Sequence, residues 1–477
     1  MSIIIPANSA AGGGYEVSNS LRFNSGSSDY LNKTLGTPTL ATKNTFSVWY
    51  KKSKVGTEES IIFANGNAGG INPRADDKIQ FYNAGGSLRT DRVFRDTSAW
   101  YNLVVVTDTT LNTADDRLKM YINGVQETSF TTRSNPSQNA ASNLGTATAH
   151  VIGCNNDPAN YFNGYMAEVC FIDGQALDPT SFGEFDSDSG IWRPISVSGL
   201  TFGNNGFYLE FGNSGALGTD SSGEGNTFTV NNLAAIDQTT DTCTNNFATL
   251  NPLDMARWQN NTPLAVLANG ALQTGIGSSE KVLLRSTIGV KKGKWYWEAK
   301  SDGVSKMFFG VCNSKCGTDA NAPHSSSDYV GVYYYEATPY YAYYSGAGNP
   351  TNGIASISSG DILNFALDCD NQTFYIGKNG TYMNSGNPAS GATGTGSINR
   401  LWNYASSLFY IDGIQTEMFA SCYVSSTSGS GTAQYNFGNP TFTGTDKSDD
   451  NDRGSFEYQP PAGYLALCTA NLSETNS

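Results

Sequence analysis

Residues 165–172 read Tyr-Met-Ala-Glu-Val-Cys-Phe-Ile, and Asp173-Gly174 follows them directly. Apolar and β-branched residues in so short a run favour a strand, and Asp-Gly is typical of the turn that closes one. Working outward, comparable aromatic or β-branched runs with a two-residue alternation recur along the chain. They are residues 46–52, 99–106, 118–125 and 207–211, then 294–300, 307–311, 360–368 and 372–376. Within 118–125, Asn123-Gly124 supplies the positive φ that a two-residue hairpin turn requires. We therefore expect an all-β fold.

The composition agrees with many short strands joined by tight polar turns. Charged residues make up 15% of the 477 residues and aromatic residues 12%, and there are 52 glycines. Proteins average about 25% charged residues and about 7% glycine. A coiled coil, a long helical bundle or a disordered chain would need more helix formers or more charge, so these classes are excluded.

The charge argues against a nucleic-acid partner. The chain has 28 Lys and Arg against 42 Asp and Glu, a net charge of −14, whereas phosphate binding needs a basic face. The pairs Lys51-Lys52 and Lys291-Lys292 lie at expected strand ends, where we expect solvated side chains. No stretch approaches the roughly 20 apolar residues of a membrane-spanning helix. Residues 1–6 lack the positive region of a signal peptide, so we expect a chain made in a cytosol.

The eight cysteines show no spacing that indicates a disulfide framework. Cys170 and Cys369 lie inside apolar runs, where we expect small buried thiols. Cys312, Cys316 and His324 are residue types that bind zinc, but their spacing matches no standard zinc motif. We expect a turn between strands there.

Five motifs in the first half, taken in order, resemble the laminin-G-like branch of the concanavalin-A-like jelly rolls. They are residues 20–23 with 29–31, then 46–49, 100–103, 121–124 and 164–168. The resemblance implies an antiparallel β-sandwich. The segments that follow, residues 171–177, 182–185 and 217–223, are similar to the sandwich domains of bacteriophage virion proteins.

A second ordered set of motifs resembles the SPRY domain, a bent two-sheet sandwich used for ligand recognition. Its landmarks are Trp295-Tyr296-Trp297-Glu298, Phe309-Gly310-Val311, Gly360-Asp361-Ile362, Leu367-Asp368 with Phe374-Tyr375, Lys378-Asn379-Gly380 and Tyr435-Asn436-Phe437-Gly438. The long Gly/Ser/Thr loops 385–398 and 424–432 depart from the family, so its usual binding loops are not transferred to this chain.

We expect two antiparallel β-sandwiches in tandem, with the rest of the chain as arm, connector and tail. The segments are an N-terminal anchoring arm (1–17), a laminin-G-like sandwich (18–212), an extended connector (213–256), a SPRY-like sandwich (257–445), and an acidic loop with a C-terminal strand (446–477). Within the arm, we expect Ile3, Ile4, Ile5 and Pro6 to anchor the chain to a virion.

Two aspartate groups are candidates for calcium, the one cofactor that we consider. Asp449, Asp450 and Asp452 lie in the acidic loop, and Asp446 brings the number of carboxylates there to four. Carboxylate oxygens are the hard ligands that calcium prefers. Asp108, Asp115 and Asp116 flank a loop where the laminin-G resemblance implies calcium in some members. The alternative is solvated turn carboxylates in both places, since the Asp-x-Asp-x-Asn-Gly spacing of a calcium loop is absent.

The sequence argues against an enzyme. His150 and His324 are the two histidines, both in polar, loop-like stretches, and no Gly-x-Ser-x-Gly elbow, HExxH helix or phosphate loop is present. No strand carries a set of acids typical of a glycosidase, although acids on different strands could converge. Glycan hydrolysis is therefore the remaining enzymatic alternative.

Consecutive tyrosines at 333–335 and 340–344 are the candidate ligand-binding residues. Neighbours in a strand point to opposite faces, so these rings cannot all enter one core. We expect Tyr334, Tyr340 and Tyr344 to form an exposed phenolic surface for sugar stacking or a protein interface, with Trp402 as a further contact. The alternative is that they too pack against a sheet.

Together these features favour a bacteriophage structural protein without catalytic residues. We expect a tail fibre or virion-surface adhesin that binds a host-cell surface glycan or receptor. The alternatives are a capsid-decorating or tail-assembly protein that docks on other virion subunits, and a glycan hydrolase. The expected partners are other phage virion proteins and the host surface, without nucleic acid or membrane insertion. Because coiled-coil heptads are missing, the sandwiches or the arm would have to form the homo-oligomer, a trimer being favoured.

Overall fold

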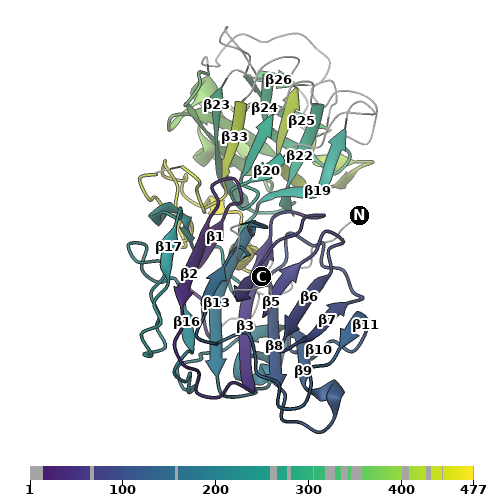
Figure 1. The fold of residues 1–477 in the computed structure, drawn as a ribbon. Coiled ribbons are helices and arrows are strands. Elements are labelled where there is room, and N and C mark those ends of the chain that lie inside the picture. Colours follow the sequence, from purple (N-terminus) through teal and green to yellow (C-terminus); the bar gives the residue numbers. More distant parts are fainter. Residues whose placement is uncertain are drawn as a thin grey trace. The chain divides into compact units, whose positions relative to one another are not determined.

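The computed structural model describes residues 14–64, 69–155, 159–257, 266–276, 281–303, 306–316, 328–334, 342–344, 357–399, 408–425, 431–442 and 444–475. The chain divides into two compact units, one ending at Asn246 and the other beginning at Phe247. Each unit contains two large sheets whose ladders are antiparallel, apart from one short parallel pair. Figure 1 shows both sandwiches, so the expected all-β fold of two antiparallel β-sandwiches is confirmed.

The first sandwich has two eight-stranded sheets. One sheet contains, in order, β10 (Val125–Gln126), β9 (Leu118–Ile122), β8 (Tyr101–Asp108), β3 (Lys43–Lys52), β13 (Gly164–Asp173), β1 (Ser20–Phe23) and β18 (Gln238–Thr239), with β16 (Phe207–Leu209) also paired to β13. The other contains β11 (Phe130–Ser134), β7 (Gly86–Thr90), β6 (Ile79–Asn83), β5 (Gly69–Pro73), β4 (Ile62–Ala64), β12 (Ala149–Ile152), β2 (Tyr30–Thr34) and β17 (Thr229–Asn231). A hairpin of β14 (Gly183–Phe185) and β15 (Trp192–Pro194) and the short 3-10 helices η1 (Ala114–Asp116), η2 (Pro179–Ser181) and η3 (Ala235–Asp237) complete the unit.

The central strand β13 shows how alternation builds two packed faces. Met166, Val169 and Phe171 face the main core, whereas Cys170 belongs to a separate apolar cluster on the other face of the sheet. The spacing between Met166 and Val169 is three residues because the pairing of β13 with β3 shifts between Ala167 and Cys170. Glu168 is the extra residue of this bulge and has φ +50°, a left-handed conformation that is uncommon outside glycine.

The segment expected as an extended connector is largely built into the sandwiches. Within residues 213–256, β17 pairs with β2 and β18 pairs with β1 in the first unit. Farther along, β19 (Leu250–Arg257) pairs with β22 (Lys281–Val290) in the second unit. The strands β17 and β18 have three residues or fewer, too short for an alternation to show in the sequence.

The second sandwich also has two large sheets. One runs β19, β22, β32 (Met418–Ser425), β24 (Lys306–Asn313), β25 (Tyr329–Tyr334) and β26 (Ala342–Tyr344). The other runs β20 (Val266–Ala268), β21 (Gln273–Ile276), β33 (Gly431–Asn436), β23 (Lys294–Gly303), β27 (Ile362–Asp368), β28 (Thr373–Lys378) and β29 (Thr381–Tyr382). Smaller elements are the hairpin β30 (Tyr410–Ile411) and β31 (Ile414–Gln415) and the 3-10 helices η5 (Met383–Ser385) and η6 (Pro388–Thr393).

The Trp-Tyr-Trp-Glu motif in β23 packs on both of its faces. Trp297 lies in the main core and stacks on Phe365, with ring centroids 5.4 Å apart. Tyr296 faces the other way and packs edge-on against Phe456 of the tail, at 5.0 Å. The backbone N–H groups of Glu457 and Tyr458 donate to the buried Glu298 carboxylate at 2.9 and 2.8 Å, so the tail covers this face of the sheet.

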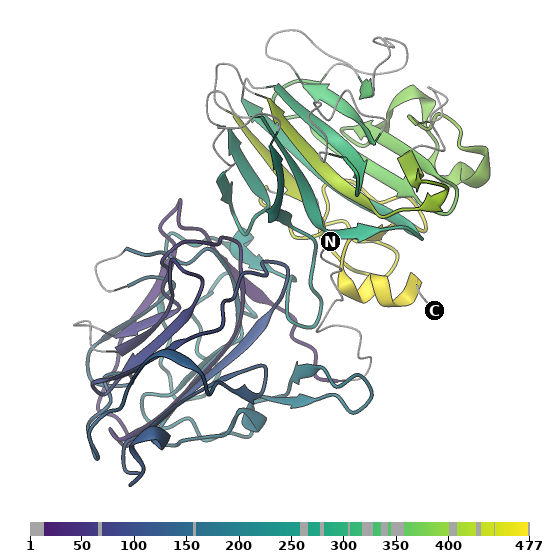
Figure 2. The same ribbon diagram turned by 90° about the vertical axis from the view of Figure 1, so that its right-hand side faces the viewer.

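The chain ends on a strand and a helix. The expected C-terminal strand is present as β34 (Leu465–Ala466), which pairs in parallel with β23. The helix α2 (Thr469–Thr475), yellow in Figure 2, follows it and was not expected from the sequence. Within the described residues, no helix has the length and apolar character needed to cross a bilayer.

Candidate functional site

A pocket of about 370 Å³ lies in the first sandwich beside the edge strand β10. Its walls come from the loop after β7, the first residue of β8 and the turn between β9 and β10. The lining residues are Arg92, Val93, Phe94, Tyr101, Ile122, Asn123 and Val125.

Local hydrogen bonds hold these walls in place. The Phe94 N–H donates to the Asp77 carbonyl at 2.7 Å, which fixes the loop after β7. Across the pocket, Asn123 has φ +48° and Gly124 has φ +75°, the two-residue hairpin turn that the sequence predicted. The Asn123 side-chain oxygen accepts from the Asn102 N–H at 2.8 Å, so the turn is tied to β8.

The pocket combines exposed apolar surface with aromatic rings and a cation. Val93 and Val125 are 43% and 58% exposed, so two of the apolar lining side chains are open to solvent. The Arg92 guanidinium lies 4.8 Å from the centre of the Phe94 ring. Phe94 in turn meets Tyr101 edge-on at 5.5 Å.

Two polar groups of this site are Tyr101, whose pKa is shifted, and Arg92, which forms an ion pair. Burial raises the pKa of Tyr101 to about 12, so its phenol is neutral at pH 7 and can both donate and accept a hydrogen bond. The Arg92 Nη2 lies 2.8 Å from Oε1 of Glu127. A concave apolar and aromatic surface with a few fixed polar groups is the general character of a small-ligand site.

Sequence reasoning did not single out this pocket. Only the Asn123-Gly124 turn was recognised, as a hairpin signal. The other residues that could have indicated the pocket are Arg92, Val93 and Phe94 in a loop and Val125 directly after the turn. They did not single it out, because isolated apolar residues of this kind are common on protein surfaces.

The predicted tyrosine surface is partly described. Tyr334 is the last residue of β25, opposite Met307 of β24, and Tyr344 is the last residue of β26, opposite Val330 of β25. The two residues thus lie on neighbouring strands at the edge of their sheet. Tyr340 and Trp402 lie outside the described residues, as do Ile3, Ile4, Ile5 and Pro6 of the arm and His324.

The first group of calcium candidates pairs with cations. Asp108 lies 2.9 Å from Lys43 Nζ and also accepts from the Thr110 backbone N–H at 3.1 Å. Asp115 lies 3.2 Å from Arg133 Nε, and Asp116 lies 3.5 Å from Lys119 Nζ.

The second group is dominated by one buried carboxylate, Asp449. It accepts from the backbone N–H groups of Asn451, Arg453 and Ala466 and from the Asn471 side-chain amide, at 2.7 to 2.9 Å. The neighbouring Asp450 accepts from the Gly463 N–H at 2.6 Å. Asp452 has φ +56° and donates its own N–H to the Asp449 carbonyl, which closes the turn. In the described part of the chain, no three His, Cys, Asp or Glu side chains gather where they could hold a metal ion.

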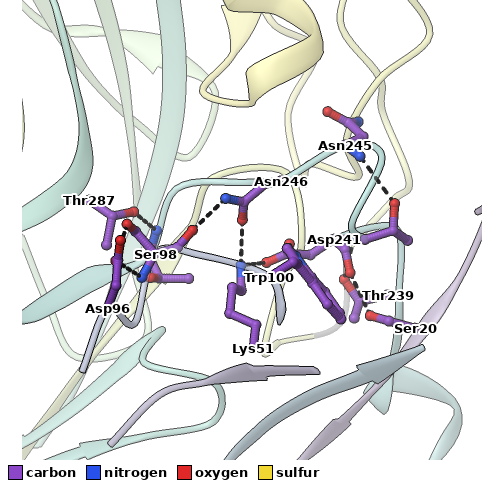
Figure 3. Close-up of polar contacts among 12 residues, drawn as sticks. Ser20, Lys51, Asp96, Ser98, Trp100, Thr239, Asp241, Asn245, Asn246 and Thr287 are labelled. Atoms are coloured by element: carbon purple, nitrogen blue, oxygen red, sulfur yellow. Dashed lines mark hydrogen bonds and ion pairs between the residues drawn. The ribbon is translucent and has the colours of Figure 1, made fainter. Parts of the chain in front are cut away.

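The expectation of solvated lysines at 51 and 52 is wrong, because both side chains are buried. Lys51 is 1% exposed and pairs with the Asp241 carboxylate, which is also buried (Figure 3). Its Nζ also donates to Asn246 at 2.8 Å, and the Trp100 indole N–H donates to Asp241 at 3.3 Å. Burial lowers the pKa of Lys51, and the Asp241 charge opposes that effect.

This buried cluster is structural. Figure 3 shows Lys51 reaching from β3 to the segment after β18, where Ser20 also binds the Asp241 carbonyl at 2.5 Å. The cluster fixes residues 239–246 against the first sandwich.

The expectation of a loop at His150 is also wrong. His150 lies in the strand β12, and its buried ring accepts from the Gly145 N–H at 2.9 Å. Burial lowers the pKa of His150 to about 4, so it is neutral at pH 7.

Comparison with known proteins supports the fold of the first unit. Residues 25–180 match a laminin-G family model described as the concanavalin A-like lectin/glucanases superfamily. The expected laminin-G-like, concanavalin-A-like domain is therefore confirmed over these residues. The comparison with curated proteins gives no match.

Three solved structures that the comparison found cover between 34% and 46% of this chain. The SPRY domain of human HERC1 is 19% identical, with 39% of this chain and 96% of that chain covered and a TM-score of 0.27. A putative carbohydrate binding protein from Bacteroides ovatus is 14% identical, with 46% and 61% covered and a TM-score of 0.29. A SAP-like pentraxin from Limulus polyphemus is 13% identical, with 34% and 80% covered and a TM-score of 0.25.

Proposed function

We propose that this chain is a bacteriophage virion-surface protein that binds a host-cell surface glycan in the pocket beside β10. The observation that carries the proposal is the wall chemistry of that pocket. Val93, Val125 and the Tyr101 ring offer apolar surface to the C–H face of a sugar ring, while Arg92 and Asn123 offer polar groups to its hydroxyls. The match to a lectin/glucanase superfamily supports a carbohydrate ligand.

The pocket favours binding over hydrolysis. Its seven lining residues include no Asp or Glu, whereas glycoside hydrolysis uses two carboxyl groups about 5–9 Å apart. We therefore propose an adhesin without catalytic residues.

The virion assignment has a different basis. It rests on the resemblance of residues 171–177, 182–185 and 217–223 to phage virion sandwiches. In this role we expect a homo-oligomer, with other virion subunits as partners. A second contact surface would come from Tyr334, Tyr340, Tyr344 and Trp402.

The test is a glycan array with single substitutions at exposed positions. Val93→Ser and Val125→Ser change the pocket wall without removing core residues. Leu40→Ser is the matched control, because Leu40 and Val93 are equally exposed, at 43%, and Leu40 does not line the pocket. We expect binding to weaken about tenfold, or about 1.4 kcal/mol, for the pocket variants and to stay unchanged for the control.

Two outcomes would contradict the proposal. Equal glycan binding by Val93→Ser, Val125→Ser and Leu40→Ser would exclude this pocket as the sugar site. Absence of binding to any glycan or host cell, together with co-sedimentation of the wild type with phage particles, would favour the capsid-decorating or tail-assembly role.

A further inference from the structure

A lysine, an aspartate and an asparagine meet in the first unit (Figure 3). The Lys51 Nζ contacts Oδ2 of Asp241 and lies 2.8 Å from Oδ1 of Asn246. The side chains of Lys51 and Asp241 are 1% and 0% exposed, and Asn246 is half-buried. One buried amine therefore touches both a carboxyl group and a carboxamide.

A further contact holds each partner of Lys51 in place. The Trp100 indole N–H donates to Oδ1 of Asp241 at 3.3 Å, which leaves Oδ2 facing the Lys51 Nζ. The Asn246 Nδ2 donates to the Ser98 carbonyl at 2.6 Å, so that Oδ1 of the same amide is directed at Nζ. The amide carbon is bonded to this oxygen, and a small shift of Nζ brings the amine to that carbon. Groups held in this way are arranged to react with each other.

The surroundings of the Lys51 Nζ are aromatic. It lies 4.7 Å from the centre of the Tyr165 ring and 5.8 Å from the centre of the Trp100 ring, and both rings belong to a buried apolar cluster. Loss of hydration raises the free energy of both charges, which favours transfer of a proton from the ammonium to the carboxylate. Burial also lowers the pKa of Lys51. A desolvated lysine amine is a nucleophile.

We propose that Lys51 and Asn246 form an intramolecular isopeptide bond, with Asp241 as the acid–base group that carries the protons. Asp241 accepts a proton from the Lys51 ammonium, and the free amine attacks Cγ of Asn246 as the carbonyl electron pair moves onto Oδ1. Asp241 passes this proton to Nδ2 and accepts a second one from Nζ. The Cγ–Nδ2 bond breaks as the carbonyl re-forms, and ammonia leaves with the second proton as ammonium.

The reaction needs no reagent from outside the protein. No electrons are gained or lost, Asp241 ends as the carboxylate, and the departing molecule is ammonia. Burial of Lys51 therefore favours the reaction and does not block it. The bond joins β3 to the segment after β18 across 195 residues of chain, and a cross-link of this kind restricts the unfolded chain and stabilises the fold.

The first test is the intact mass of the full-length folded protein. The bond removes one ammonia, so we expect the wild type to be lighter than its sequence by about 17 Da. Asn246→Ala should have its full sequence mass. Asn245→Ala is the matched control, because it changes the neighbouring asparagine and should keep the loss. Asp241→Asn removes the acid–base group and should have its full sequence mass.

The second test locates the bond by digestion with trypsin and the protease Asp-N. Cleavage after Lys43 and Lys52 and before Asp241 and Asp254 releases residues 44–52 and 241–253. We expect these two segments in one branched peptide, since an acylated Lys51 resists trypsin. In Asn246→Ala they should be separate peptides, with cleavage after Lys51 restored.

Four results would overturn the proposal. The first is a wild type at its full sequence mass with separate peptides. The second is a mass loss that persists in Asn246→Ala. The third is a loss of about 18 Da, one water, with the bond mapped to Asp241, which would make Asp241 the acceptor of the amine. The fourth is a folded Asp241→Asn with the same mass loss as the wild type, which would exclude Asp241 as the acid–base group.

Discussion

The Tyr208 hydroxyl donates a 2.7 Å hydrogen bond to Oε2 of Glu168. Glu168 is the bulge residue of β13, and Tyr208 comes from β16, the strand that pairs with β13 just beyond the bulge. The Tyr15 hydroxyl reaches the same carboxyl oxygen at 3.3 Å. A buried carboxyl group in a left-handed backbone conformation thus links three separate parts of the first unit.

We predict that Glu168 makes stability fall as the pH rises. Burial raises the pKa of Glu168 from 4.5 to about 7. Because the folded-state pKa is the higher one, the unfolded state loses this proton first, and the stabilisation present below pH 4.5 is lost progressively up to about pH 7. The linkage amounts to at most about 3 kcal/mol. Urea unfolding of Glu168→Gln and wild type from pH 4 to pH 8 measures it.

The Glu168→Gln variant should show a flatter pH dependence and be the more stable of the two at pH 8. Glu59 is the matched comparison, because burial raises its pKa to about 7 as well. We expect Glu59→Gln to remove a separate part of the pH dependence. Identical pH profiles for Glu168→Gln and wild type would contradict the raised pKa of Glu168.

We predict that the buried pair of Lys51 and Asp241 tolerates double replacement better than single replacement. Asp241→Ala leaves the Lys51 charge buried without its carboxylate and should destabilise the first sandwich by about 3–5 kcal/mol. Lys51→Met with Asp241→Leu removes both charges and should cost less. Chemical denaturation followed by tryptophan fluorescence measures both variants.

The exposed pair of Asp116 and Lys119, at 3.5 Å, provides the control for charge pairs. Asp116→Ala should change stability by less than about 1 kcal/mol. An effect of Asp241→Ala no larger than that of Asp116→Ala would show that the buried pair is not needed for the fold.

We predict that Asp449 holds the end of the chain to the second sandwich. Asp449→Ala leaves four donors without their acceptor and should destabilise this unit by about 2–4 kcal/mol. Asp450→Ala removes the acceptor of one hydrogen bond, that from the Gly463 N–H, and should cost about 1 kcal/mol or less. Thermal unfolding followed by circular dichroism compares the two variants, and equal losses would contradict this role.

We predict that calcium leaves the stability unchanged. Asp108, Asp115 and Asp116 lie against Lys43, Arg133 and Lys119. Asp449 already accepts hydrogen bonds from four donors. The melting temperature should therefore be the same in EDTA and in calcium chloride. A calcium-dependent rise that Asp449→Ala or Asp115→Ala abolishes would instead establish a metal site.

The sequence by itself determined the strands and their division into two sandwiches. The alternation in 46–52 and 294–300 and the Asn123-Gly124 turn are local signals, because side-chain direction and turn geometry depend on neighbouring residues. The motif series of the first unit also indicated its superfamily, which the match of residues 25–180 confirms.

Only the tertiary structure decided which polar residues are buried and where a pocket opens. Lys51 pairs with Asp241, which lies 190 residues farther along the chain. Glu168 accepts a hydrogen bond from Tyr208, which lies 40 residues farther along. The short strands β17 and β18 likewise exist through pairing with β2 and β1. The pocket joins a loop after β7 to the β9–β10 turn. These features depend on which distant segments become neighbours when the sheets form, and no local pattern of residues encodes that pairing.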